Sequence, residues 1–420
     1  MFHFPPPVIM ERVNPVDKSF SQIPEILSQI KAANPGTVTE LATAASEQGS
    51  HHFKHVFISH GASQDGFPFQ RNLIVVSGAH LRRNKPLFLI VAVSQDANFQ
   101  TFPLAFAVVD SQSDQSWRWF LRHLEQCFSD SKQLTVLSDG GAMVSRALTA
   151  CYPEAHHVDC LRRLQLSVHL YFKVNALKSL VREAACAHTA VAFRRSFNKI
   201  KEVNPDCADY LQVVGFPRWT SYYQAGDRFN IMTAGIAQGF IHSLLPQTVG
   251  PISNLLHCYH TTAMLWFRAR LHAAMDHTGV LKPGVQSYMD RISTTKSQWK
   301  VIIKSSGTCE VISTQGEIQF VSPLRRSCSC KVFNKLRIPC VHAMVASESL
   351  GVSAEALVHH CYTSVAWFES YITQLHRYQE LPNAETITQV FPELLPPSTS
   401  SIAGSPTATI RMVIIFLHFI

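Results

Sequence analysis

The stretch that decides the fold of this chain is residues 73–110, "LIVVSGAHLRRNKPLFLIVAVSQDANFQTFPLAFAVVD". It holds three apolar runs, at 73–81, 87–96 and 102–110, which are separated by the short turn segments "RRNKP" and "ANFQ". The first run is continuously apolar, as is typical of a central strand that is buried on both faces. The pattern predicts three strands in an antiparallel meander.

The residues that follow alternate between helix and strand patterns. Residues 113–128 have apolar residues at helical spacing, with Ser113 or Asp114 as the candidate N-cap. A strand at 134–140 with an acidic residue at its end, a short helix at 143–152 and a last strand at 156–159 come next. This order predicts an α/β (α+β) class with a ribonuclease-H-like core. In that fold, carboxylates from strands one and four and from a late helix hold two metal ions about 4 Å apart for phosphoryl chemistry.

A second segment, "CSCKVFNKLRIPCVH" (328–342), has the pattern of a metal site. It contains Cys328, Cys330, Cys340 and His342, spaced C-x-C-x9-C-x-H. Two cysteines two residues apart lie on the same side of an extended backbone, and the nine residues between the pairs are long enough to turn back. Thiolate and imidazole ligands in a set of four predict a tetrahedral Zn²⁺ site without an open coordination position.

The neighbouring residues predict a small zinc-bound module of the ββα kind. Strand-like runs precede the site at 299–306 and 309–322, and a helical run follows it at 341–351, with Gly351 as the expected C-cap. Zinc bound in so small a unit contributes roughly 10 kcal/mol or more to folding. Three other groups are weaker candidates and are expected to be packed or surface histidines: His51, His52, His55 and His60; His156, His157 and Cys160; and His359, His360 and Cys361.

The composition narrows the classes of protein that the chain can belong to. Its 420 residues are 46% hydrophobic and 16% charged, which indicates a globular chain rather than a disordered one. The net charge of +8 permits contact with nucleic acid but does not demonstrate it. Eleven cysteines and no visible secretory signal favour a reducing compartment, the nucleus or otherwise the cytosol. The apolar end, "MVIIFLHFI", is too short to span a bilayer, so we expect no membrane partner.

Several segments together resemble one family, the Mutator-like element (MULE) transposases of plants. The resemblance runs through "FKHVFISHGASQDGF", the strands of 73–110, "TVLSDG", "YPEAHHVDCLRRL" and "WTSYYQAGDRFNIMTAGIAQGFIHSL". It covers about residues 20–385 and ends with the C-x-C-x9-C-x-H pattern, which resembles a SWIM-type zinc finger. The resemblance implies a transposase core, followed by a zinc module that contacts DNA or protein.

The resemblance also implies a triad of two aspartates and one glutamate, and this chain departs from it. The triad positions correspond to Ser77 in "SGAHL", Asp139 in "SDGG" and Gln238 in "GIAQGFI". Serine and glutamine add no negative charge for Mg²⁺, so we expect the catalytic triad to be non-functional. Neither Asp96 nor Asp110 is expected to replace the missing acids.

The chain departs from the family pattern at further positions. The family's C-x-x-H pair keeps Cys160 but has Arg163 in place of histidine, so we expect Cys160 to be a buried small side chain. His80 is expected to point to the sheet face opposite Ser77. The chain begins almost at the core, so the region that recognises element ends is expected to be absent.

We expect six parts: a helical lead-in (1–72), the transposase core (73–172), a helical insertion with the helices that complete the core (173–295), the zinc module (296–351), a helical segment (352–391) and a flexible tail (392–420). Four basic residues of the insertion could contact phosphate or lie on a solvated helix face: Arg194, Arg195, Lys199 and Lys201. Trp219, Tyr222 and Tyr223 are expected in a core or along a groove.

Three functions are consistent with these features. The first is a catalytically inactive, transposase-derived zinc protein that binds DNA or protein, either as a host regulator or as a decaying copy. The second is an active transposase that cleaves and transfers DNA strands with metal ions. The third is a zinc module that binds only protein.

Overall fold

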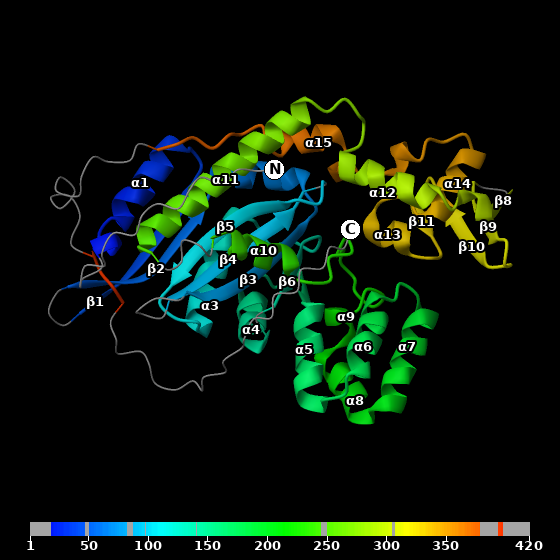
Figure 1. Ribbon diagram of the computed structural model, residues 1–420, viewed down its shortest axis with the longest axis horizontal. Helices are drawn as coiled ribbons and strands as arrows, with labels where there is room; N and C mark the ends of the chain where they lie inside the picture. Colours follow the sequence, from blue (N-terminus) through cyan, green and yellow to red (C-terminus); the bar gives the residue numbers. More distant parts are fainter. Residues whose placement is uncertain are drawn as a thin grey trace.

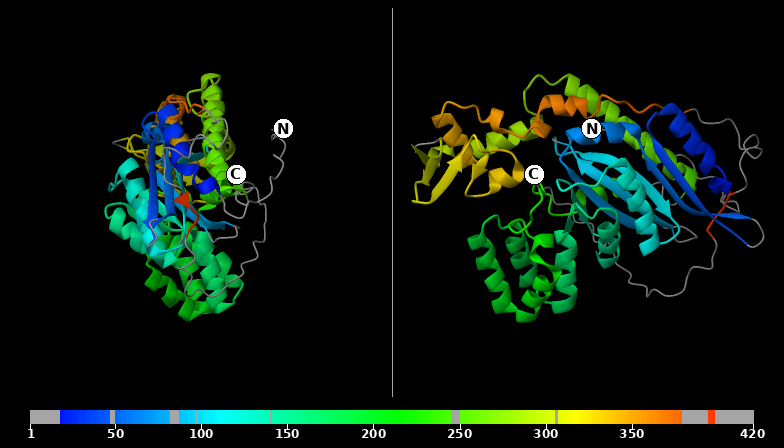
Figure 2. Two further views of the ribbon diagram at one scale, coloured as in Figure 1. Left: turned by 90° about the vertical axis from the view of Figure 1, so that its left-hand side faces the viewer. Right: turned by 180° about the vertical axis from the view of Figure 1, so that it is seen from behind.

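The computed structural model describes residues 18–46, 50–81, 87–96, 98–139, 141–244, 250–304, 307–378 and 394–397. These residues form three parts (Figures 1 and 2): a large sheet flanked by helices, a separate bundle of helices, and a small module with its own sheet. We call them the core, the helical unit and the finger module.

The core sheet has the strand order β1-β2-β5-β4-β3-β6-β7, and the short β12 pairs with β2. The predicted meander is confirmed, because β3, β4 and β5 pair antiparallel in that order. β6 and β7 then continue the sheet on the other side of β3, and both run parallel to it. The strands are β1 (Val38–Ala45), β2 (His51–Ser59), β3 (Leu73–Leu81), β4 (Leu87–Gln95), β5 (Thr101–Val109), β6 (Thr135–Ser138), β7 (His156–Asp159) and β12 (Leu394–Leu395).

Helices pack against both faces of this sheet, because its strands carry apolar side chains on both sides. One face packs against α3 (Asp114–Cys127) and α4 (Gly141–Cys151), and the other against α1 (Ile23–Ala33) and α10 (Gly235–Leu244). The long helix α11 (Ile252–Met275) contributes side chains to both apolar clusters. Ser113 is the N-cap of α3, since its side chain accepts a hydrogen bond from the Ser116 amide.

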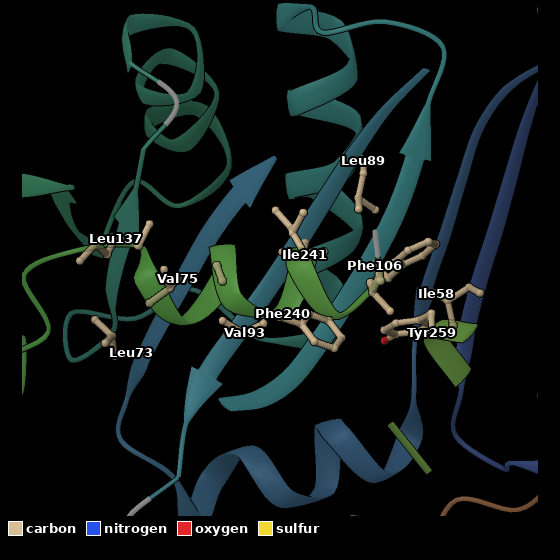
Figure 3. Close-up of a cluster of buried hydrophobic side chains, with 14 of the residues drawn as sticks. Ile58, Leu73, Val75, Leu89, Val93, Phe106, Leu137, Phe240, Ile241 and Tyr259 are labelled. Atoms are coloured by element: carbon tan, nitrogen blue, oxygen red, sulfur yellow. The ribbon is translucent and has the colours of Figure 1, made fainter. Parts of the chain in front are cut away.

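Helix α10 lies across the central strands (Figure 3). Its Phe240 and Ile241 are buried in the apolar cluster that includes Val75 and Leu89 of the neighbouring strands. This packing fixes the height and rotation of α10 over β3. It therefore also determines where the polar residue Gln238, about one turn before Ile241, lies over the sheet.

The helical unit consists of α5 (Leu161–Phe172), α6 (Ala176–Cys186), α7 (Ala190–Val203), α8 (Pro205–Val214) and α9 (Phe216–Trp219). It has its own apolar cluster, which includes Leu164, Val181 and Trp219. α5 lies before the expected boundary at 172/173 but packs with the helical unit. α10 and α11 pack against the core, within the range 173–295 that is expected to hold the helices that complete it.

The finger module contains a four-stranded sheet of order β11-β10-β9-β8. Its elements are β8 (Trp299–Ile303), β9 (Cys309–Ser313), β10 (Ile318–Ser322), β11 (Ser327–Cys328), α13 (Val332–Leu336) and α14 (Val341–Ser349). The run 309–322 is two strands, because Gly316 turns the chain with a φ of 85°. Gly351 follows α14 with a φ of 70°, and the hydrogen bonds of residues 351 and 352 back to Glu348 and Ser347 form the expected C-cap.

The first and last parts of the chain differ from expectation. The lead-in contains α1 and α2 (Gly61–Gly66), but also β1 and β2, which extend the core sheet. Residues 352–378 contain two short 3-10 turns and one short helix, α15 (Ser364–Glu369). A further helix, α12 (Pro283–Ser293), precedes the finger module. Residues 394–397 are not a free tail, because β12 pairs parallel with β2. The expectations for 1–17, 379–393 and 398–420 lie outside the described residues.

None of the helices in the described ranges is both long and apolar enough to cross a membrane.

Candidate functional site

Local structure brings the four predicted metal ligands together in the finger module. Cys328 ends β11, and Cys330 follows it before the turn into α13. Lys331 and Arg337, at the two ends of α13, have φ values of 62° and 60°, which turn the chain back on itself. Cys340 is then the N-cap residue of α14, and His342 lies in its first turn.

The ligand atoms have the spacing of a tetrahedral metal site. His342 Nδ1 lies 3.6 Å from Cys328 Sγ and 3.7 Å from Cys340 Sγ, and the sulfur atoms of Cys330 and Cys340 are 3.6 Å apart. All four ligand atoms lie within 4.8 Å of one another. Zinc–sulfur bonds of about 2.3 Å and zinc–nitrogen bonds of about 2.0 Å in a tetrahedron separate the ligand atoms by about 3.5–3.8 Å. The donor set and its geometry therefore fit Zn²⁺.

Neighbouring groups hold this cluster in place. Trp299 packs edge-on against the His342 ring, with centroids 4.2 Å apart and an interplanar angle of 83°. The Cys328 amide donates a hydrogen bond to Asn334 Oδ1 at 3.1 Å. Contacts of this kind orient metal ligands before the ion binds.

The finger module is packed against the rest of the protein rather than joined by a free linker. Ile338 and Met344 are buried in the same apolar cluster as Val285 and Met289 of α12. This cluster is continuous with the core, so the position of the finger depends on the fold of the core.

Two polar contacts join α13 to the segment between α9 and α10. The Arg337 guanidinium donates two hydrogen bonds to Asp227, at 2.8 and 3.1 Å. The Lys335 ammonium donates one to the carbonyl of Gln224 at 2.8 Å. The segment that leads to Gln238 is thus attached to the finger module.

The second predicted site lies on the core sheet, where the carboxyl end of β6 stands beside the middle of β3. Val76 of β3 pairs with Ser138 of β6, so the next residues, Ser77 and Asp139, lie beside each other. The Ser77 hydroxyl donates a hydrogen bond to Asp139 Oδ2 at 2.8 Å. The Gln238 side-chain amide donates to the same oxygen at 3.0 Å. The structure therefore brings all three positions together, although the first and the last are 161 positions apart in the sequence.

The carboxyl group of Asp139 lies in a partly buried environment. Burial raises its pKa from the ordinary value of 3.8, and this effect outweighs the hydrogen bonds from Ser77 and Gln238 and the charge of Arg163, which lower it. Both neighbours thus stabilise the carboxylate without adding negative charge.

A third group of residues beside this site has no simple sequence signal. Asp159 ends β7 and pairs in register with Ser138, the residue before Asp139, so its side chain points to the sheet face opposite to that of Asp139. Its carboxylate accepts two hydrogen bonds from the Arg218 guanidinium, at 2.7 and 2.9 Å. The buried Arg228 donates to the carbonyl of Arg218 at 2.5 Å. The second acid beside this site is therefore already paired with a cation.

The other residues singled out in the sequence lie elsewhere. Asp110 follows β5, two strands away from β3, which is about 10 Å at the usual strand spacing. Asp96 accepts backbone hydrogen bonds in its turn, and the ring of His80 packs on Phe88 on the sheet face away from α10. Cys160 is buried, and its sulfur accepts a hydrogen bond from the Ala234 amide at 3.3 Å.

In the described part of the chain, Cys328, Cys330, Cys340 and His342 form the one group of three or more potential ligands close enough to hold a metal ion. The weaker histidine groups do not converge in this way. The four basic residues of α7, Arg194, Arg195, Lys199 and Lys201, are all exposed. Trp219 is fully buried, whereas Tyr223 is partly exposed at the edge of an aromatic cluster with Phe193 and Phe216.

Comparison with known proteins finds one match that lies mainly in the core and one in the finger module. The family model of the MULE transposase domain matches residues 73–166, and the model of the SWIM zinc finger matches residues 314–351. No curated protein matches the chain. The first match covers β3 to the first half of α5, including Ser77 and Asp139, and the second covers all four metal ligands. The chain therefore carries a MULE transposase domain and a SWIM zinc finger, as a MULE-type transposase family protein does.

Proposed function

We propose that this protein is a transposase-derived DNA-binding protein that holds one structural Zn²⁺ ion and does not cleave DNA strands. The proposal rests on one observation: the two groups next to the Asp139 carboxylate are a serine hydroxyl and a glutamine amide, and both donate hydrogen bonds to it.

The strand order supports a ribonuclease-H-like core. Three antiparallel strands, β3 to β5, are followed by β6 and β7, which are added in parallel beside β3. In such a core the metal ions lie at the ends of the first and fourth strands. Asp139 follows the end of β6, Ser77 lies beside it in the middle of β3, and α10 supplies Gln238 from the covering helix.

The charge at this site is too small for two divalent cations. A pair of Mg²⁺ ions about 4 Å apart needs several carboxylate ligands between them. Asp139 brings one negative charge, and the carboxylate of Asp159 is engaged by Arg218. Without paired metal ions, neither the attacking water nor the leaving oxygen is activated for phosphoryl transfer.

Zinc is the ion that fits the finger best, because four soft or borderline ligands close the coordination shell. The ion would be held by Cys328, Cys330, Cys340 and His342, and it would supply folding free energy rather than chemistry. The family matches, the net charge of +8 and the exposed basic face of α7 support DNA as the partner and the nucleus as the location.

The test measures binding and cleavage in parallel on the zinc-loaded chain. Retention of duplex DNA should weaken as salt rises, and each substitution that removes a phosphate-binding cation should reduce the slope of log K against log salt by about 0.9. The variant Arg194→Glu with Arg195→Glu is compared with Lys31→Glu, an exposed lysine on α1 of the core.

Strand cleavage is measured with Mg²⁺ and with Mn²⁺ on DNA that carries transposon ends. No turnover is expected. Turnover that disappears in Asp139→Ala would favour the alternative of an active transposase. Failure to retain DNA even at low ionic strength would favour the alternative of a zinc module that binds protein only.

A further inference from the structure

Two buried cations lie where the core, the start of α12 and the segment after the finger module meet. Arg71 stands just before β3 with 2% of its surface exposed, and Lys282, the residue before α12, is completely buried. The Lys282 amide donates to the carbonyl of Tyr362 at 3.3 Å, and the Gly284 amide donates to Asn98 Oδ1 at 2.9 Å. Three segments that are distant in sequence are thus joined around these two side chains.

The guanidinium of Arg71 has one edge available for a ligand. It lies between the rings of Phe99 and Tyr362, 4.7 and 5.0 Å from their centroids, and Nη1 donates to the side chain of Gln95. Nε and Nη2 are buried and have no hydrogen-bond partner within the described residues. These two nitrogens share the edge with which arginine binds anions through two parallel hydrogen bonds.

The ammonium of Lys282 is likewise buried without a hydrogen-bond partner in the described ranges. The carboxylate that acts on it is Asp96, but both oxygens of that group are engaged. Oδ1 accepts from the amides of Asn98 and Gln100, and Oδ2 accepts from the Tyr371 hydroxyl at 2.9 Å. Burial lowers the pKa of Lys282 to about 8, so the group is still mainly charged at neutral pH.

The charges around these groups do not balance. Arg71 and Lys282 bring two positive charges, Asp96 brings one negative charge, and the N-terminus of the eleven-residue helix α12 adds partial positive charge. Buried cations and N–H groups are strongly unfavourable unless a hydrogen-bonding anion accompanies them. The complete burial of Lys282 favours a monatomic ion over a phosphate group.

We propose that Arg71 and Lys282 bind a small monovalent inorganic anion of the size of chloride. The anion accepts hydrogen bonds from the free edge of the guanidinium and from the ammonium. It ties the start of α12 and the segment around Tyr362 to the first residues of β3. This site is separate from Asp139 and from the metal ligands, and it does not depend on DNA binding.

The test uses the full zinc-loaded chain and follows its thermal unfolding while sodium chloride replaces sodium gluconate at constant ionic strength. Ligand that binds the folded state should raise the midpoint with a saturating dependence on chloride, by about 2 °C or more. The variant Lys282→Met should lose this dependence. The matched control Lys178→Met, which changes an exposed lysine of α6, should keep it.

The proposal is wrong if the unfolding midpoint of wild type does not change with chloride, or if it changes equally in all three proteins. Water would then be the partner of these groups. Should Lys282→Met fail to fold, the ³⁵Cl NMR line width of wild type decides. If the protein broadens the chloride line and added bromide, which competes for the site, narrows it again, the anion site is supported. A line as narrow as in buffer alone refutes the proposal.

Discussion

Placing carboxylates at the two neighbours of Asp139, Ser77 and Gln238, should create a site for divalent metal. In Ser77→Asp/Gln238→Glu, new carboxylates replace groups that now lie 2.8 and 3.0 Å from Asp139 Oδ2. Two unit charges 4 Å apart repel by about 4 kcal/mol at the effective dielectric constant typical of protein sites. We therefore expect the metal-free variant to lose up to about 4 kcal/mol of stability for each pair of charges, less where one acid becomes protonated.

Metal should reverse this loss, because Mg²⁺ or Mn²⁺ neutralises the cluster. A ligand present at one hundred times its Kd adds about 2.7 kcal/mol to the free energy of unfolding. Urea unfolding of the zinc-loaded proteins with and without millimolar Mg²⁺ measures the effect. The control Ser77→Asn has nearly the volume of the aspartate variant without its charge and should show no response to Mg²⁺. A folded double variant that gains nothing from Mg²⁺ would refute the reasoning.

Three further predictions concern zinc, pH and the contact between the finger and the core. Metal analysis should find about one zinc per chain, and Cys340→Ser should lose it together with roughly 10 kcal/mol of folding free energy in the module. Folding raises the pKa of Asp139, so ionisation of this group lowers the free energy of unfolding above pH 3.8. Asp139→Asn should therefore unfold at a higher denaturant concentration than wild type at pH 7. The difference between the two proteins should shrink as the pH falls toward 3.8. Chelation of zinc, or Arg337→Ala, should speed hydrogen exchange around Asp227, whereas Arg291→Ala on α12 should not.

The core strands and the metal ligands could be predicted because local patterns encode them. The run 73–81 is mainly apolar, and the structure forms β3 over those same residues. The spacing of Cys328, Cys330, Cys340 and His342 implies convergence, and their atoms lie within 4.8 Å of one another.

The features that were missed depend on contacts between distant residues. The strand β1 reads "VTELATAA", whose small side chains and lack of strict alternation do not separate strand from helix, so only its pairing with β2 defines it. Arg218 lies 59 residues from Asp159, and Arg337 lies 110 residues from Asp227. Spacings of that length carry no periodic signal, and the pairs emerge only when the core, the helical unit and the finger module pack together.

The most direct test of the account counts Mn²⁺ ions bound to the zinc-loaded protein by electron paramagnetic resonance, in wild type and in Asp139→Asn. If one aspartate is too little charge to hold a metal pair, the two proteins bind the same small amount of Mn²⁺, with no spin-coupled signal. A coupled pair of Mn²⁺ ions in wild type that vanishes in Asp139→Asn would contradict the account.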